Sequence, residues 1–310
     1  DILRLLHLWF NYGYLKNVSS AFTNGFNITS VDTWLVVIPQ LLARLNEVQT
    51  DELTKLIQNL LIKIGEKHPQ ALIYPLTVAI KSNTNDENID KQKVIQYVID
   101  KIKEYSLNNI ILIEEAFLVS QELIRCAILW DEMWYESLEE ASRIYFGNKD
   151  AIGMIEQLMP LHDKLNNGGA TFNEISFQQL YGRDLFEALE WCHRYKLTNN
   201  ESDLNQAWEY YAYVFRCINK NLSNLNNLQL QYISPKLSNA KNLNIIVPGT
   251  YTNNYNNSII NINSFISHLK VMESKQRPRK ISMIGSNGKE YSFLLKGHED
   301  LRLDERVMQL

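Results

Sequence analysis

Between residues 121 and 220, four long stretches of helically spaced apolar residues alternate with short loops. We expect helices over residues 121–145, 151–165, 171–196 and 203–220. Gly147 ends the first stretch, and Thr171 with Glu174 forms a capping box at the start of the third. Because short loops make consecutive helices antiparallel, this region predicts an up-and-down four-helix bundle.

Residues 1–120 repeat the helical spacing in shorter pieces. Apolar positions recur at helical intervals over residues 32–45 and 52–64. His68-Pro69 should end one helix and start the next, because proline is tolerated in the first turn of a helix. Short paired helices with brief loops favour an α-solenoid over a compact bundle, although no clean repeat is visible.

The hydrophobic pattern changes to that of strands in the last third of the chain. We expect strands over residues 244–247 and 259–262, a hairpin from 280–284 to 290–295, and a helical tail over 300–310. Asn287-Gly288 in the hairpin turn supplies positive φ angles. The predicted fold class is therefore mainly α, in three parts: the end of an α-solenoid (1–120), a four-helix up-and-down bundle (121–220) and a partial α+β lobe (221–310).

Composition limits the classes of function. A net charge of -4 and a pI near 5.9 give no general reason to expect nucleic acid as a partner. The three cysteines are odd in number and widely spaced, which is typical of buried thiols in a reducing compartment rather than of disulfides or a metal site. We expect a soluble intracellular chain, and its two amphipathic ends indicate a piece of a larger protein.

The segment from residue 274 onward combines the parts of a nucleotide-phosphate clamp. Ser274 begins a basic loop before the hairpin, Lys296 closes the second strand, and Glu299 and Asp304 follow. Such clamps use loop donors and a lysine on the phosphates, with a carboxylate to hold the lysine. The alternatives are a surface lysine, acids that complement a helix dipole, and a basic loop that is a solvated turn or a short nucleic-acid patch.

A second group of residues lies in the predicted bundle. Ser142 and Phe146 are four residues apart on the first helix, and Trp208, Ala212 and Phe215 share one face of the last. If these helices pack side by side, an aromatic cleft forms between them. By pattern alone an ordinary core is favoured, because aromatic stripes are usually core.

Several motifs resemble the TOR protein kinases of the PI3K-related kinase family. ELIRCAILWDEMW (122–134), LEEASRIYFG (138–147) and YGRDL (181–185) resemble the FKBP–rapamycin-binding module of that family. HPQALIYPL (68–76) resembles the end of its helical FAT region, and SKQRPR (274–279) and LKGHEDLR (295–302) resemble the start of its kinase N-lobe. The resemblance covers essentially the whole chain in the family's order.

The resemblance implies a serine/threonine kinase that uses ATP with Mg²⁺. Ser274 would belong to the phosphate loop, Met272 and Leu294 would flank the adenine, and Lys296 would contact the phosphates and pair with Glu299. Asp304 would lie at the back of the pocket. The catalytic residues and Mg²⁺ ligands would lie outside this chain, so the fragment alone should be inactive. A non-catalytic scaffold with a kinase-like lobe is the alternative, and a lipid kinase of the same superfamily is disfavoured by the bundle.

The resemblance also assigns the bundle cleft to an immunophilin–rapamycin complex and to the recruitment of protein substrates. The implied cleft residues are Leu138, Ser142, Tyr145, Phe146, Asn205, Trp208, Glu209, Ala212 and Phe215. Other implied partners are TOR complex subunits, through which a cytoplasmic protein would reach the lysosome or vacuole membrane. Ala212 stands where the family usually has a tyrosine, Asn205 where it has a threonine and Glu209 where it has an aspartate. We therefore expect weaker rapamycin binding.

Overall fold

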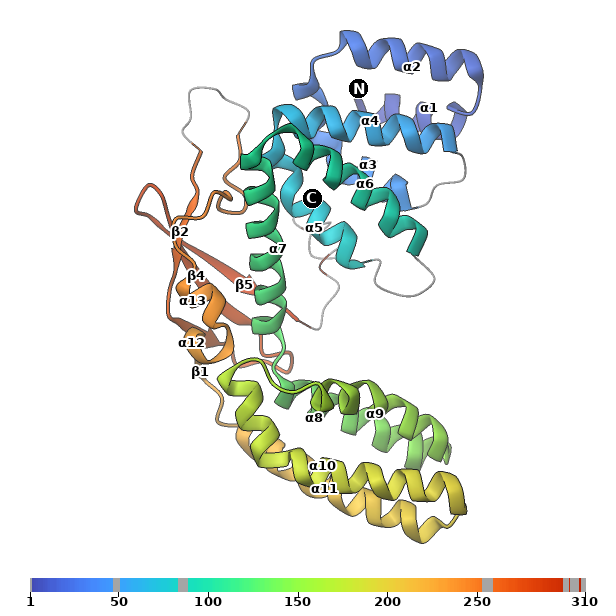
Figure 1. Ribbon diagram of the computed structural model, residues 1–310, viewed down its shortest axis with the longest axis vertical. Helices are drawn as coiled ribbons and strands as arrows, with labels where there is room; N and C mark the ends of the chain where they lie inside the picture. Colours follow the sequence, from blue (N-terminus) through green and yellow to red (C-terminus); the bar gives the residue numbers. More distant parts are fainter. Residues whose placement is uncertain are drawn as a thin grey trace. The chain divides into compact units, whose positions relative to one another are not determined.

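The computed structural model describes residues 2–46, 51–82, 89–252, 259–297, 301 and 307 (Figure 1). The chain divides into two compact units. The first contains residues 1–120, 241–263 and 285–289, and the second contains residues 121–240, 264–284 and 290–310. The predicted tail over 300–310 lies almost entirely outside the described residues.

The first unit consists of short helices that pack on their neighbours in sequence, as an α-solenoid requires. They are α1 (Ile2–Tyr12), α2 (Lys16–Ile28), the 3₁₀ helix η1 (Val31–Val37), α3 (Ile38–Asn46), α4 (Asp51–Lys67), α5 (Pro69–Ser82), α6 (Ile89–Tyr105) and the start of α7 (Leu107–Ala127). The predicted break at His68 is confirmed, since α4 ends at Lys67 and α5 begins at Pro69. Among the described residues no single helix has the length and apolar composition of a membrane span, although one bent pair, residues 16–26 with 31–45, passes on those criteria.

The second unit contains the predicted four-helix bundle. Its helices are α8 (Trp130–Ser142), continued by the π-helical turn η3 (Arg143–Gly147), then α9 (Ala151–Asn166), α10 (Phe172–Thr198) and α11 (Glu201–Leu222). The capping box is present: the Thr171 hydroxyl accepts from the Glu174 amide, and the Glu174 carboxylate accepts from the Thr171 amide. Trp134, Phe177 and Tyr211 are among the largest side chains that the bundle core buries.

The prediction of one continuous helix over residues 121–145 is wrong. Helix α7 ends at Ala127, and α8 begins three residues later at Trp130. Leu129 is extended, with φ -83° and ψ 161°, and its amide donates to the Glu132 carboxylate at 3.0 Å. The break therefore satisfies its own backbone and starts α8 with an acidic residue at the positive end of the helix dipole.

A five-stranded sheet follows the bundle in sequence. Its strands are β1 (Asn227–Gln229), β2 (Ile262–Phe265), β3 (His268–Val271), β4 (Arg279–Gly285) and β5 (Glu290–Leu295). The order is β1-β3-β4-β2, and β5 also pairs with β4. Two short helices, α12 (Leu230–Ile233) and α13 (Pro235–Asn239), follow β1. The predicted hairpin is confirmed as β4–β5, but in its turn only Gly288, with φ +74°, has a positive φ.

The predicted strand over residues 244–247 is wrong, and the strand predicted over 259–262 lies instead at Ile262–Phe265. Ile246 forms an isolated bridge with Asn261. Two helix side chains accept backbone N–H groups of this segment: Glu115 binds the Asn244 amide at 2.6 Å, and Gln70 binds the Ile246 amide at 3.2 Å. The Leu243 and Val247 amides donate to the Ile262 and Ile260 carbonyls, at 2.9 and 2.8 Å, so the segment pairs locally with residues 260–262 without forming a regular strand.

Candidate functional site

The sheet register brings together three of the residues predicted to bind a nucleotide. Lys270 on β3 pairs with Lys280 on β4, and Lys280 pairs with Leu294 on β5. Met272 and Lys296 each come one residue after the end of β3 and β5, and continued side-chain alternation would place them on the same face as Lys270 and Leu294. Met272 is 40% exposed and Leu294 is 52% exposed, so this face presents apolar surface to solvent beside a lysine.

The opposite face of the same strands is buried. Val271, Arg279 and Ile281 occupy the alternate positions, and none is more than 5% exposed. The sheet thus has one covered face and one open face, as an antiparallel sheet permits. The open face is the one that can receive a flat apolar ring next to a cationic group.

Ser274 lies in a tight loop between β3 and β4. The Met272 amide donates to the Pro278 carbonyl at 2.9 Å, which closes the loop. The Ser274 hydroxyl accepts from the Gln276 amide at 3.2 Å, and Arg277 adopts φ +42°. This loop and residues 222–226 line a cavity of about 190 Å³. Ser274 is therefore near Met272 and exposed, as a phosphate-loop residue must be.

Glu299 and Asp304, the carboxylates expected to hold Lys296, lie outside the described residues. Lys296 itself is half-buried directly after β5. Within the described part of the chain, no group of three or more His, Cys, Asp or Glu residues is arranged to hold a metal ion.

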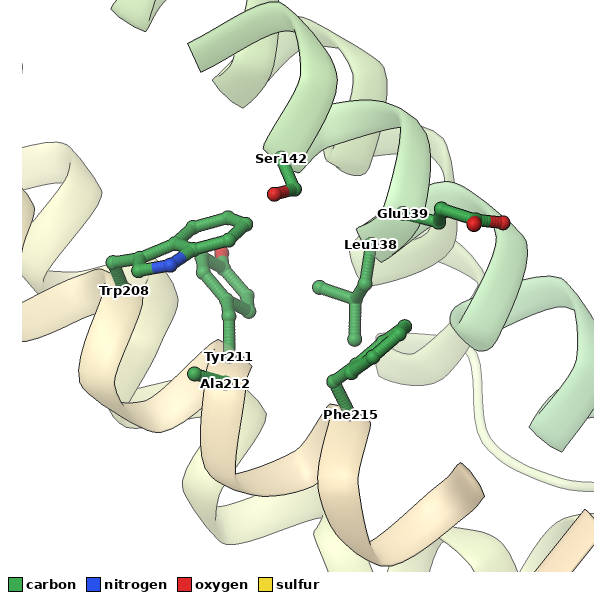
Figure 2. Close-up of a pocket in the computed structure, with 7 residues that line it drawn as sticks. All are labelled: Leu138, Glu139, Ser142, Trp208, Tyr211, Ala212 and Phe215. Atoms are coloured by element: carbon green, nitrogen blue, oxygen red, sulfur yellow. The ribbon is translucent and has the colours of Figure 1, made fainter. Parts of the chain in front are cut away.

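A second site lies between α8 and α11. It is a cavity of about 140 Å³. Trp208 and Phe215 project toward it from one helix and Leu138 from the other (Figure 2). The lining residues are Leu138, Glu139, Ser142, Trp208, Tyr211, Ala212 and Phe215. The two helices therefore form a cleft as well as a core. Ala212 contributes only a methyl group to its wall (Figure 2).

The remaining predicted cleft residues do not line this cavity. Tyr145 and Phe146 contact Trp208 at its rim, with ring centroids 6.1 and 5.2 Å from the indole. Asn205 and Glu209 lie on α11 away from the lining, and Glu209 accepts from the Gln206 side chain at 3.4 Å. Rim and lining together still make a largely aromatic surface, of which Phe146 is 60% exposed.

Sequence reasoning missed Glu139 and Tyr211. Tyr211 lies three residues after Trp208, a helical interval that should have placed it on the same face. The Tyr211 hydroxyl lies 2.9 Å from His162 Nε2 and 3.7 Å from Cys192 Sγ. Burial raises the pKa of Tyr211 well above its usual value and lowers the pKa of His162 to about 4. The cleft floor is therefore uncharged at neutral pH.

Comparison with known proteins gives matches over both halves of the chain. The FKBP12-rapamycin binding domain family matches residues 122–220, and the HEAT repeats of ATR-like serine/threonine-protein kinases match residues 17–119. The chain is 49% identical to the serine/threonine-protein kinase TOR of Oryza sativa subsp. japonica and 48% identical to that of Arabidopsis thaliana. It is 46% identical to TOR2 of Saccharomyces cerevisiae.

These alignments cover all of this chain but only 12% of each relative. Among solved structures, the open conformation of CtTel1 matches the whole chain with a TM-score of 0.53 and 16% identity, over 9% of that protein. That likeness supports the fold alone. The identities to the TOR sequences extend through the solenoid, the bundle and the sheet.

Proposed function

We propose that this chain, which belongs to the family of TOR serine/threonine-protein kinases, supplies half of the ATP site of an enzyme that phosphorylates protein serine and threonine. The observation that carries this proposal is the strand register, which places Leu294 on the open face, with Met272 and Lys296 each one residue past the ends of β3 and β5. In this proposal residues 1–120 are the end of the FAT solenoid, 121–220 the FKBP–rapamycin-binding bundle and 221–310 the start of the kinase N-lobe.

Each residue on the open face has a distinct part in the proposed site. Met272 and Leu294 cover the two sides of the adenine, and the Lys296 ammonium group contacts the phosphates. The Ser274 hydroxyl and its loop amides add hydrogen-bond donors to the phosphates. In this proposal Glu299 would pair with Lys296, and Asp304 would belong to the back of the pocket. Mg²⁺ ligands and the catalytic base belong to parts of the kinase outside this chain, so the chain alone transfers no phosphate.

The test of this function uses the intact protein that contains the chain. We expect it to transfer the γ-phosphoryl group of ATP to a serine or threonine peptide and not to a phosphoinositide. Transfer to the lipid alone would contradict the protein-kinase proposal. No transfer to either, with Mg²⁺ and ATP present, would favour the alternative of a helical scaffold with a kinase-like lobe.

The cleft between α8 and α11 is proposed to bind an immunophilin–rapamycin complex and to recruit protein substrates. Its apolar lining and exposed aromatic rim suit such a ligand, because aromatic side chains dominate binding energy at interfaces. We also propose TOR complex subunits as partners, and a cytoplasmic location from which those partners carry the protein to the lysosome or vacuole membrane.

Ala212→Tyr is expected to tighten the immunophilin–rapamycin complex. A tyrosine would fill part of the cavity wall that Ala212 leaves open, and burying that extra surface is worth about 1–3 kcal/mol. This corresponds to a change of about 5-fold to 150-fold in Kd. Titration of wild type and variant with the preformed immunophilin–rapamycin complex measures the change, and Tyr213→Phe, on the exposed side of α11, is the control. Equal affinities for wild type and Ala212→Tyr would show that position 212 does not limit binding.

A further inference from the structure

We propose that the junction between α7 and α8 positions Lys296 through the buried Glu132–Arg279 ion pair and the contact of Gly297 with Ile128. The inference rests on the proposed function, because it assigns regulation of the same ATP site. It makes Glu132, Arg279 and Gly297 positioning residues: none of them lies on the open face of the sheet, and each acts through the strands that carry Lys296.

The ion pair is fully enclosed. Arg279 on β4 is 0% exposed and Glu132 on α8 is 2% exposed, and the Arg279 Nη2 donates to the Glu132 carboxylate. The same carboxylate oxygen accepts from the Leu129 amide at 3.0 Å, and Arg279 Nη1 donates to the Arg277 carbonyl at 2.8 Å. One side chain therefore connects the break before α8 to the loop that contains Ser274.

The buried Glu132–Arg279 pair is better explained as fixing the arrangement of α8 and β4 than as adding to the stability of the fold. Removing two charges from water costs energy that their attraction only partly offsets, so buried ion pairs are often no more stabilising than apolar residues. Their best-attested benefit is to favour one arrangement of the groups they join. Here the pair joins one end of the bundle to the strand at the centre of the sheet.

The strand register places Arg279 beside the nucleotide residues. Arg279 pairs with Val271 on β3 and with Leu295 on β5. Met272 directly follows Val271, and Lys296 directly follows Leu295. The Arg279 side chain lies on the buried face of the sheet, where its ion pair fixes the position of β4. Its cross-strand partners Val271 and Leu295 directly precede Met272 and Lys296, so fixing β4 also positions those two residues.

Gly297 provides a second and independent connection. A Cβ atom added at this glycine would lie 2.7 Å from the Ala127 carbonyl oxygen and would overlap the Ile128 side chain. The residue after Lys296 therefore passes directly against the α7–α8 break. Lys296 is bracketed by this close contact on its own strand and by the ion pair on the neighbouring strand.

The junction is itself held firmly within the bundle. Arg125, near the end of α7, donates to Glu122 at 2.9 Å and contacts Glu174, in the first turn of α10, at 3.2 Å. The buried Glu122 carboxylate also accepts from the Ser234 hydroxyl at 2.7 Å. A displacement of the bundle at this point would be transmitted to the strands through Arg279 and Gly297.

The test uses Arg279→Lys, Glu132→Gln and Gly297→Ala in the intact kinase, with KM for ATP, KM for peptide and kcat measured separately. Lysine keeps the charge but loses the fork of donors, and glutamine keeps an acceptor but loses the charge. We expect kcat/KM for ATP to fall between about tenfold and 100-fold, because small misplacements of a reacting group have effects of that size. KM for peptide should stay within about twofold if the effect is confined to the ATP site.

Controls separate positioning from folding and from the proposed function. Arg143→Met removes an exposed ion pair with Glu140 on the same stretch of helix, and it should leave the ATP parameters unchanged. A double-mutant cycle of Glu132→Gln with Arg279→Lys should be strongly non-additive, because the two residues act as a unit. If an ion-pair variant melts at a much lower temperature, Gly297→Ala, which leaves that pair intact, decides the question.

Two results would overturn different claims. Wild-type kcat/KM for ATP in folded Arg279→Lys and Gly297→Ala variants, alongside an inactive Lys296→Met variant, would refute the positioning inference and leave the ATP site in place. Full activity of Lys296→Met would instead refute the ATP site itself.

Discussion

In the intact protein that contains this chain, the proposed function predicts that Lys296→Met reduces γ-phosphoryl transfer by about 100-fold or more. Lys296 directly follows β5, two positions after Leu294, and is the lysine that the proposed function assigns to the phosphates. Removing one preorganised donor to developing negative charge typically costs about 3–4 kcal/mol in the transition state. Methionine has a similar length and no charge, so the loss would reflect the ammonium group rather than packing. Initial rates with a serine or threonine peptide measure it.

The matched control for this experiment is Lys280→Met. Lys280 pairs with Leu294 across the sheet, so it lies on the same face two positions from the row of Lys296. It has no place in the proposed site, and its removal should change the rate by less than about threefold, as is usual for exposed positions. Equal losses in the two variants would mean that the face acts through its overall charge, and the specific role of Lys296 would be wrong.

His162→Gln is expected to remove an acid-dependent loss of stability from the bundle. The His162 imidazole is buried beside Tyr211 and Trp134, and burial lowers its pKa from 6.5 to about 4. Between these pH values the unfolded chain binds a proton at this histidine and the folded chain does not. The free energy of unfolding therefore falls as the pH decreases from 6.5 to about 4, by about 3 kcal/mol in total. Above pH 6.5 the neutral form is favoured in both states and this contribution vanishes.

Hydrogen exchange of the α10 and α11 amides reports the opening free energy of the bundle at each pH. The difference between wild type and His162→Gln must be used, because Asp131 acts in the opposite direction: burial raises its pKa from 3.8 to about 6, which stabilises the folded state as the pH falls. His193→Gln, at a half-exposed histidine on α10, is the control. Parallel profiles for wild type and His162→Gln from pH 7 to pH 4 would show that His162 titrates normally in the folded bundle.

Helix starts were predicted correctly where the sequence signal lies within one helical turn. The Thr171–Glu174 capping box and the proline at position 69 set helix starts that the structure confirms, because both act within one turn. The break before α8 was missed because its region keeps a helical apolar pattern, while the carboxylate that caps it also binds an arginine 147 residues away. The segment over 244–247 pairs only locally with residues 260–262, and its Asn244 and Ile246 amides bind the distant side chains of Glu115 and Gln70, contacts that no local pattern shows.

The candidate sites were predicted only as separate residues. Met272, Leu294 and Lys296 were named from motifs, yet their common face depends on a register across three strands. Helical spacing on one helix was enough to name Trp208, Ala212 and Phe215. The cleft also requires Leu138 from another helix, and Tyr211 forms its floor. Asn205 and Glu209 share α11 with the lining residues but do not line the cavity.

Sequence alone determined the fold class of this protein, the helical spacing of its bundle and the residue types available for a phosphate site, because hydrophobic periodicity and capping act over a few residues. Only the tertiary structure decided which of those residues meet. Side-chain contacts such as Glu132–Arg279 and Tyr211–His162 join positions that no local pattern relates, and their formation depends on how the helices and strands pack. The open face of the sheet and the cleft of the bundle are both products of that packing.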